Sequence, residues 1–484
     1  MRKAAFHNLG CKVNSYETEA MQQLLEDAGY EIVPFKEGAD VYIINTCSVT
    51  NVADKKSRQM LHRAKKMNPD AAVVAVGCYV QAAGRELEKD SAVDLIIGNN
   101  KKKDLVEILE RYFADQEQNR EMIDIGASQE YEELHIRKIA DHTRAFIKVQ
   151  DGCNQFCSYC IIPYTRGRVR SRDPEEVIRE VEGLAAAGYK EIVLTGIHLS
   201  SYGLDFRKKE ALRESKKVQA EESGPAASME SDFLKEEEAW KAISGRERDA
   251  ANVPVGIQDL LGLIVRLDQI PGIERIRLGS LEPRIITEEF AEKLSGLRTI
   301  CPHFHLSLQS GCEATLKRMN RHYTPEEYLE RCEILKRAFR NPAITTDVIV
   351  GFPGETEAEF EETKAFLEKV GFYEMHIFKY SKRAGTRAAS MKDQVPEPVK
   401  GERSDCLLKL EAELSADYRR SFLGQETELL LEEPVEIDGA KYMMGHTRQY
   451  VKGAVPFKEG LKNRTVKGRF TRMLNAELLL LEPS

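Results

Sequence analysis

Cys153-Asn-Gln-Phe-Cys157-Ser-Tyr-Cys160 places three cysteines on one short segment, directly after an apolar run at residues 145–149 that is typical of a buried strand. Three thiolates on one tight loop can each bind an iron of a [4Fe–4S] cube, which takes cysteine ligands, and one corner of the cube stays open. A zinc site is the alternative. Structural zinc usually takes four ligands in Cys or Cys/His pairs, which this spacing does not supply. The spacing therefore favours a cluster.

Further apolar runs follow this loop, separated by segments with helical signals. Asp173-Pro174 is an N-cap followed by proline, and Thr356 with Glu359 forms a capping-box pattern. Each run ends in a polar or glycine-containing loop, and barrel enzymes place their chemistry at the carboxyl ends of such strands. We expect a full or partial (β/α) barrel within residues 140–421. The expected strands are residues 145–149, 191–194, 275–278, 304–308, 345–349 and 374–378.

The first 120 residues predict an α/β domain with a parallel sheet. Apolar runs at residues 41–44, 73–76 and 95–97 alternate with helical patterns at residues 17–28 and 53–67. Cys11, Cys47 and Cys78 each follow an expected strand, so a parallel sheet could bring them to one edge. Again there are three thiols and no fourth partner nearby. The alternative is three buried free cysteines, since cysteine is often fully buried.

Three other regions differ in composition. Residues 115–141 are charged and predict a connecting segment, and residues 205–252 predict a charged insertion with a short helix at residues 233–243 that holds Trp240. Residues 422–484 predict a small β-barrel from short runs separated by turn residues. Its basic residues, including Arg448, Lys467 and Arg469, lie among aromatic ones. The expected strands of this barrel are residues 427–431, 441–446, 465–471 and 476–481.

Composition narrows the class of protein. A net charge of −8 argues against a protein that coats nucleic acid everywhere, but allows a local basic site. No apolar run approaches the roughly 18 residues of a membrane span, and no secretory signal is present, so we expect a cytoplasmic protein. Thiols stay reduced there, which makes metal binding or burial the first interpretation of the ten cysteines. Four of them show no paired spacing and predict core positions: Cys301, Cys312, Cys332 and Cys406.

Over nearly its whole length the sequence resembles the methylthiotransferase family of radical S-adenosylmethionine (SAM) enzymes. The motifs that carry the resemblance are Leu9-Gly-Cys11-Lys-Val-Asn14, Asn45-Thr-Cys47, Val76-Gly-Cys78, the Cys153–Cys160 triplet running into Thr165-Arg-Gly-Arg168, Gln309-Ser-Gly311, Met319-Asn-Arg321 and Asp347–Glu355. The resemblance implies an N-terminal α/β domain, a radical SAM partial barrel and a C-terminal RNA-binding β-barrel of the TRAM kind.

The resemblance also implies the cofactors, which are SAM and two [4Fe–4S] clusters. One cluster is expected on Cys153, Cys157 and Cys160, where SAM is cleaved to a 5′-deoxyadenosyl radical. The other is expected on Cys11, Cys47 and Cys78, and its open iron carries the sulfur to be inserted. The residues expected to contact SAM are Tyr159, Gly196, Gln309, Ile349 and Gly351. Hydrogen-atom abstraction requires no acid–base pair, so none is assigned.

For the reaction, the resemblance implies methylthiolation at C2 of N6-threonylcarbamoyladenosine-37 (t6A37) in tRNA. Alternatives are isopentenyladenosine-37 in tRNA and an aspartate of a ribosomal protein. A non-catalytic RNA-binding protein with structural metal is the alternative from another class. Expected partners are the tRNA anticodon stem-loop and a reducing protein such as flavodoxin or ferredoxin. The candidate RNA contacts are Arg166, Arg168, Arg448, Lys467 and Arg469.

For the arginine run and for His198, a purely structural role is an interpretation of equal or greater weight. The run that contains Arg166 and Arg168 could instead make surface ion pairs. His198, at the end of an expected strand, could touch substrate, but a hydrogen-bonded structural histidine is the favoured interpretation.

Overall fold

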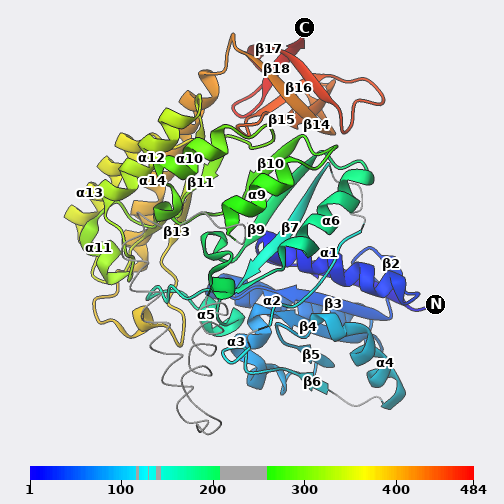
Figure 1. Cartoon of the computed structure of the whole chain (residues 1–484). Coiled ribbons are helices and arrows are strands. Elements are labelled where there is room, and N and C mark those ends of the chain that lie inside the picture. The colour runs from blue at the N-terminus through cyan, green and yellow to red at the C-terminus, as the bar shows by residue number, and fades with distance from the viewer. Residues whose placement is uncertain (116–118, 129, 138–142, 208–258) are drawn as a thin grey trace, which may run out of the picture.

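The computed structural model describes residues 1–115, 119–128, 130–137, 143–207 and 259–484 (Figure 1). Its first unit is a parallel six-stranded sheet with the strand order β2-β1-β3-β4-β5-β6. The strands are β1 (Lys3–Asn8), β2 (Glu31–Val33), β3 (Val41–Thr46), β4 (Ala72–Gly77), β5 (Leu95–Ile97) and β6 (Asn119–Glu121), and the helices are α1 (Lys12–Asp27), α2 (Asn51–Met67), α3 (Cys78–Leu87) and α4 (Leu105–Asp115).

Burial on both faces explains the central strands of this sheet. Every residue of β3 and β4 is buried, as expected for a parallel sheet that is covered on both sides. Helix α1 differs from the prediction because it begins at Lys12, directly after Cys11, instead of at residue 17. The sequence analysis had no signal for β2 and β6, which are only three residues long.

The second unit is a partial barrel of six parallel strands, in the order β7-β9-β10-β11-β12-β13. Isolated bridges join β10 to the β11 side, and the short antiparallel strand β8 (Arg170–Ser171) pairs with β7. The six strands are β7 (Arg144–Asp151), β9 (Glu191–Gly196), β10 (Arg275–Leu278), β11 (His303–His305), β12 (Ala343–Val350) and β13 (Glu374–Lys379). The predicted α/β fold class is confirmed.

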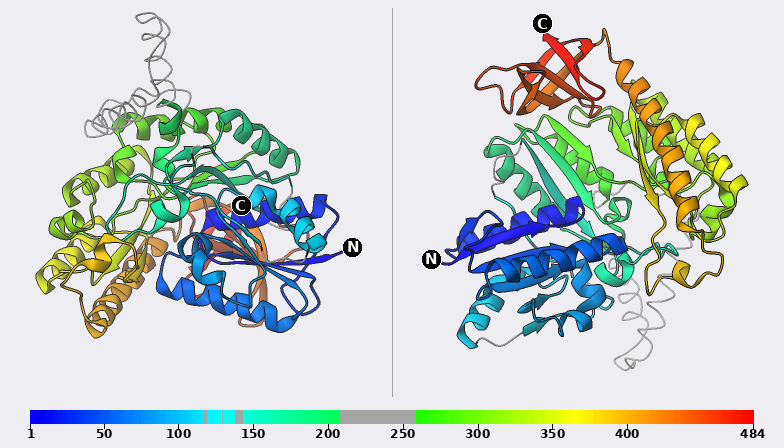
Figure 2. Two further views of the ribbon diagram at one scale, coloured as in Figure 1. Left: turned by 90° about the horizontal axis from the view of Figure 1, so that it is seen from below. Right: turned by 180° about the vertical axis from the view of Figure 1, so that it is seen from behind.

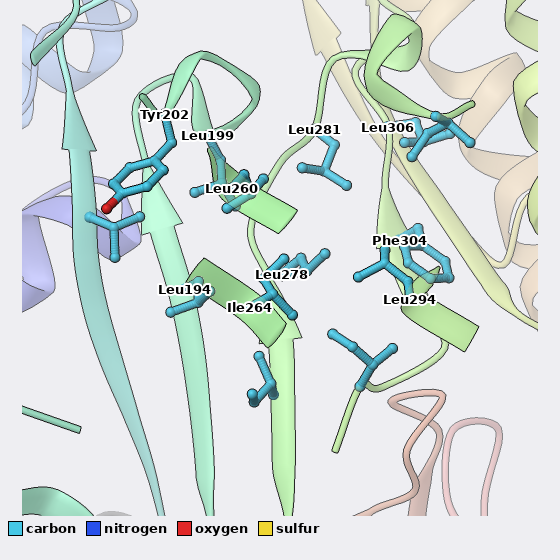
Figure 3. Packing of buried hydrophobic residues seen from close by; sticks show 14 of the residues in the cluster. Leu194, Leu199, Tyr202, Leu260, Ile264, Leu278, Leu281, Leu294, Phe304 and Leu306 are labelled. Carbon is cyan, nitrogen blue, oxygen red and sulfur yellow. The ribbon is translucent and has the colours of Figure 1, made fainter. Parts of the chain in front are cut away.

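Helices cover the outside of this partial barrel and bury its core. Figure 3 shows Leu194 of β9, Leu278 of β10 and Phe304 of β11 facing helix residues such as Ile264. The covering helices are α6 (Pro174–Ala186), α9 (Leu260–Asp268), α10 (Glu288–Ser295), α11 (Glu313–Arg318), α12 (Pro325–Ala338), α13 (Glu357–Val370) and α14 (Glu397–Arg420). The short helix α5 (Ile162–Arg166) packs instead against α3 of the N-terminal unit. The predicted caps form: Asp173 accepts from the Glu175 and Glu176 amides, and Thr356 with Glu359 makes a capping box. In the part of the chain that the structure describes, no helix is both long and apolar enough to cross a membrane.

The C-terminal unit is a closed barrel with the strand order β14-β15-β16-β18-β17. Its strands are β14 (Glu426–Ile437), β15 (Ala440–His446), β16 (Lys452–Pro456), β17 (Thr465–Met473) and β18 (Leu479–Pro483). Strand β16 was not predicted, because Lys452-Gly-Ala-Val-Pro456 is short and contains both glycine and proline. In the right-hand view of Figure 2 this β-barrel lies at the top, apart from the N-terminal sheet at the lower left.

The β-barrel docks on the amino ends of the partial-barrel strands. Tyr450, in the loop between β15 and β16, stacks on His303 at a ring-centroid distance of 5.1 Å. The guanidinium groups of Arg144 and Arg277 lie 5.0 and 4.6 Å from the Tyr450 ring centroid. Beneath this ring, the carboxylate of buried Glu191 pairs with Arg144 and Arg277 at 3.0 and 3.1 Å. Aromatic stacking and buried ion pairs therefore fix the β-barrel at this end.

The N-terminal unit contacts both edges of the partial barrel. Helix α1 packs beside β7. On the other side, Arg383, which follows β13, pairs with Asp54 of α2 at 2.6 Å and donates to the Ser48 hydroxyl at 2.7 Å. The N-terminal sheet thus spans the opening that β7 and β13 leave between them.

The predicted connecting segment at residues 115–141 is more ordered than its charge suggested. It contains β6, and residues 134 and 136 lie in the core of the partial barrel. The Tyr16 hydroxyl donates to the Leu134 carbonyl at 2.5 Å, which ties the segment to α1. Most of the predicted insertion at residues 205–252, including Trp240 and the helix at residues 233–243, lies outside the described residues.

Glu191→Gln is expected to destabilise the protein by about 3–5 kcal/mol at neutral pH, because it leaves buried arginines without their counter-charge. Although burial opposes the charged form, Arg277 and Arg144 lower the pKa of Glu191 to about 2. A lowered carboxyl pKa stabilises the fold above the unfolded pKa of about 4.3, and this contribution is lost as the pH falls toward 2. The difference in free energy of unfolding between the wild type and Glu191→Gln should therefore become smaller below about pH 4.

Chemical denaturation at pH values from neutral down to about 2 measures this difference in the free energy of unfolding. Glu402→Gln, at an exposed position on α14, is the matched control and should change stability by less than about 0.5 kcal/mol. Equal unfolding midpoints for the wild type and Glu191→Gln would contradict the prediction.

Candidate functional site

The Cys153–Cys160 loop lies at the carboxyl end of β7, where a barrel enzyme keeps its chemistry. The Cys153 amide donates to the Gly167 carbonyl at 3.0 Å, and the Ser158 hydroxyl donates to the Arg318 carbonyl at 2.8 Å. All three cysteines of the loop are half-buried and free. The backbone therefore holds the three thiols on one fixed turn.

The surroundings of this loop disfavour free thiolates. Burial, with a smaller contribution from the neighbouring Cys157, raises the pKa of Cys153 to about 12. Burial and Cys157 also raise the pKa of Cys160. A cation faces the Cys157 thiol, since an Arg321 guanidinium nitrogen lies 3.4 Å from the Cys157 sulfur. Metal binding would deprotonate such thiols, whereas they are poor nucleophiles on their own.

A second set of cysteines gathers at the carboxyl edge of the N-terminal sheet, after three adjacent strands. Cys11 follows β1, Cys47 follows β3 and Cys78 follows β4. Gly10, at φ +114°, allows the close approach of Cys47, because a Cβ at residue 10 would lie 3.2 Å from the Cys47 sulfur. Burial raises the pKa of Cys47 to about 11, and Cys78 and Cys11 both contribute to the shift. The structure thus places the three thiols at one edge of the sheet, within electrostatic range of one another.

The number of thiols bears on the kind of metal group that each site could hold. Each set offers three free thiols. A structural zinc ion usually takes four ligands, whereas a cube of iron and sulfur binds cysteine ligands at separate corners and can keep one corner open. The residues present therefore fit a [4Fe–4S] cluster at each site.

Arg166 connects the two cysteine sets. It ends α5, six residues after Cys160, and its Nε donates to the Cys78 sulfur at 3.2 Å. Its other nitrogens donate to both carboxylate oxygens of Glu17 at 2.8 and 3.0 Å. This side chain is completely buried. The predicted role of Arg166 as an RNA contact is therefore wrong, because no part of it reaches the surface.

The residues expected to contact SAM lie around the Cys153–Cys160 loop. Tyr159 and Ile349 pack against the same small apolar cluster, which includes Phe352. Gly351 has a φ of +71°, and a Cβ there would lie 2.3 Å from the Lys400 side chain. Gln309 also has a positive φ, and its amide donates to the Asp347 carbonyl at 2.9 Å. Gly196 ends β9 against Gln150.

The remaining candidate RNA contacts fall into two groups. Arg168 is exposed, and its guanidinium lies 4.6 Å from the ring centroid of Phe156, within the cysteine loop. Lys467 and Arg469 are exposed on β17. Arg448 donates instead to the Arg298 and Ile300 carbonyls at 2.6 and 3.1 Å, so most of its hydrogen bonds serve the docking of the β-barrel.

His198 and the four cysteines outside the two sets lie in surroundings that suit a structural role. Burial lowers the pKa of His198 to about 4, and its Nδ1 lies 2.6 Å from the Ser201 hydroxyl. The four remaining cysteines are buried or half-buried and unpaired, as predicted: Cys301, Cys312, Cys332 and Cys406.

Sequence analysis missed one group of polar residues inside the barrel. His305 of β11, Asp347 of β12 and His376 of β13 lie on neighbouring strands, and His305 Nε2 is 3.3 Å from an Asp347 carboxylate oxygen. Asp347 is two residues before Ile349, so both side chains lie on the same face of β12. In the sequence these residues are visible only as polar positions within otherwise apolar strands. Such positions indicate a shared site only when the register of the neighbouring strands is known.

Comparison with known proteins agrees with this geometry. The profile of the radical SAM superfamily matches residues 147–367, and that of the uncharacterized protein family UPF0004 matches residues 3–98. Threonylcarbamoyladenosine tRNA methylthiotransferase MtaB of Bacillus subtilis (strain 168) is 39% identical over 99% of this chain and 98% of its own. The chain belongs to the radical SAM methylthiotransferase family.

Two further relatives represent two named activities within this family. The MtaB protein of Aquifex aeolicus (strain VF5) is 38% identical over 89% of this chain and 92% of its own. The tRNA-2-methylthio-N(6)-dimethylallyladenosine synthase of Moorella thermoacetica is 35% identical over 96% of this chain and 94% of its own. Membership makes this chain a methylthio-transferring enzyme that uses SAM and [4Fe–4S] clusters.

Removal of either cysteine set should halve the iron content. Two [4Fe–4S] clusters correspond to about eight irons per chain, so replacing Cys11, Cys47 and Cys78 by alanine should leave about four. Replacing Cys153, Cys157 and Cys160 should have the same effect on iron but should also abolish reductive SAM cleavage. Iron assay after anaerobic reconstitution measures this. Cys332→Ala, in the core, is the control that should keep full iron, and full iron in either triple variant would refute the assignment.

Proposed function

We propose that this enzyme converts N6-threonylcarbamoyladenosine-37 of tRNA to its 2-methylthio derivative. The observation that carries the proposal is the pair of three-thiol sites that Arg166 joins across one domain interface. The relatives with 39% and 38% identity are named for threonylcarbamoyladenosine tRNA, which supports this substrate over the dimethylallyl one.

In this proposal each cysteine set holds one cluster. When bound, the cluster on Cys153, Cys157 and Cys160 supplies the electron for SAM cleavage, and that on Cys11, Cys47 and Cys78 carries the sulfur to be transferred. Tyr159 and Ile349 would lie beside the adenine of SAM, since both pack against one apolar cluster next to the loop. Gly351, which is next but one to Ile349 in sequence, would approach the same adenine through its backbone.

The chain's own task is to hold the two sets at a fixed separation and to exclude water. Glu17 of α1 forms an ion pair with Arg166, and Asp151 of β7 accepts from the same guanidinium at 3.2 Å. Because the N-terminal sheet covers the opening of the partial barrel, a reactive carbon radical would be shielded from solvent. No side chain is required to move a proton in the abstraction step.

Arg168, Phe156 and Tyr164 form the proposed stacking surface for the anticodon loop. The rings of Phe156 and Tyr164 meet edge to face at 6.0 Å, and Tyr164 is 52% exposed. Aromatic rings and guanidinium planes of this kind bind unpaired RNA bases. Lys467 and Arg469 on the β-barrel would contact phosphates further along the stem.

The enzyme would work in the cytoplasm, where its tRNA substrate is found, with a flavodoxin or ferredoxin as electron donor. Nucleosides from tRNA of a deletion strain test the proposed function by mass spectrometry. We expect t6A to accumulate and its 2-methylthio form to disappear, with restoration by the intact gene. Loss of 2-methylthio-isopentenyladenosine instead, or an unmodified ribosomal protein in place of a tRNA change, would refute the proposed substrate.

The double variant Arg168→Ala/Tyr164→Ala should bind a t6A-containing anticodon stem-loop roughly 10- to 100-fold more weakly, because stacking contributes about 1–3 kcal/mol per base. Iron content and substrate-free SAM cleavage should stay unchanged. Fluorescence anisotropy with labelled RNA measures the affinity. Arg340→Ala, which removes an exposed arginine at the amino end of the barrel, is the control. Unaltered affinity in the double variant would exclude the stacking surface.

A further inference from the structure

The two tRNA nucleosides named for the relatives differ in charge at the end of the N6 substituent. A threonylcarbamoyl group ends in a carboxylate that is ionised at neutral pH, whereas a dimethylallyl group is apolar. A carboxylate that leaves water must find a cation or hydrogen-bond donors, because an unpaired buried charge costs several kcal/mol. A cavity that accepts t6A therefore needs a free cation near the reacting atoms.

Most cations at the interface between the N-terminal sheet and the partial barrel are already paired. Glu17 alone accepts from Lys102, Lys148 and Arg166, at 3.1, 2.7 and 2.8 Å. At the amino end of the barrel, Glu191 accepts from Arg144 and Arg277 in the same way. These cations have a structural counter-charge and are not available to a ligand.

Lys12 differs from these residues. It is the first residue of α1 and directly follows Cys11, a ligand of the proposed sulfur-carrying cluster. Its side chain is exposed, and with the residues that the structure describes it forms no hydrogen bond or ion pair. No acidic residue lies in the first turn of α1, where the helix dipole adds positive potential.

The surroundings of Lys12 place it toward the barrel interior. The guanidinium groups of Arg277 and Arg144, on β10 and β7, lie within electrostatic range of Lys12, and so does the Glu191 carboxylate that pairs with both of them. Lys12 also acts electrostatically on His303 of β11, as does His305. Helix α1 packs against β7 and β9, which is consistent with a side chain directed across these strands. An incoming anion would relieve the repulsion that Lys12 feels there.

The group of His305, Asp347 and His376 is the other polar feature of the barrel interior. The Asp347 carboxylate would repel a second carboxylate, so this group is a poor receptor for the end of the threonyl moiety. Its acceptor oxygens suit N–H donors of a nucleobase instead. The distribution of charge therefore favours Lys12 as the carboxylate partner.

We propose that the Lys12 ammonium pairs with the carboxylate of the threonylcarbamoyl substituent and so selects t6A over uncharged N6 substituents. This inference rests on the proposed function and adds a specificity-determining residue to it. Because Lys12 adjoins Cys11, the same contact would set the position of adenine C2 relative to the sulfur-carrying site. Lys12 makes no bond and transfers no proton.

The test compares two anticodon stem-loops, one with t6A and one with its neutral methyl ester, in the reconstituted full-length enzyme. The wild type should prefer the acid by roughly 10- to 100-fold in kcat/KM, in line with a charged hydrogen bond. Lys12→Gln should lose this preference by losing activity on the acid while keeping activity on the ester. Lys12→Arg should restore most of the preference.

Iron content and SAM cleavage without RNA must match the wild type in each variant, which separates substrate selection from damage at neighbouring Cys11. Lys56→Gln, at an exposed lysine of α2, should leave the acid-to-ester ratio unchanged. An unchanged ratio in Lys12→Gln, with a wild type active on t6A, would overturn the role of Lys12 alone. A wild type inactive on t6A but active on isopentenyladenosine RNA would overturn the proposed function as well.

Discussion

The buried pairing of Arg166 with Glu17 is the interaction on which the arrangement of both cysteine sets depends. It joins the segment that follows the Cys153–Cys160 loop to the helix that follows Cys11, and the same guanidinium reaches the Cys78 sulfur. A buried ion pair of this kind adds little net stability, since desolvation offsets most of the attraction. Its value is positional, because Arg166 can satisfy all its donors only when the two domains meet in one orientation.

The partial barrel is enclosed by two different units. The N-terminal sheet spans the opening between β7 and β13, whereas the β-barrel covers the amino ends of the strands through Tyr450 and the charges around Glu191. Both contacts use buried or half-buried polar groups at the ends of strands. The barrel wall itself depends on apolar packing between strands and outer helices, as Figure 3 shows. Packing therefore forms the barrel, and electrostatics orients its partners.

Sequence was sufficient for the features that local chemistry determines. Cysteine spacing indicated the Cys153–Cys160 set, and the position of Cys11, Cys47 and Cys78 after expected strands indicated the other. Apolar runs located the long strands, because each of these signals lies within a few residues. Arg166 was misassigned because a charged run usually lies at the surface, and only the meeting of two domains shows that it is buried. The group of His305, Asp347 and His376 was missed for a related reason, since its members lie far apart in sequence and meet only through strand register. Strand β16 was missed because its pairing partners, and not its own residues, make it a strand.

Tyr450 has a consequence for the order of events during turnover. Its ring stacks on His303 and His446 and lies against Arg144 and Arg277, and so blocks the barrel at the amino end. Traffic of nucleotide, methionine and spent nucleoside is thereby confined to the opposite mouth, beside the Cys153–Cys160 loop. A product must therefore leave through this mouth before the next substrate can enter by the same route.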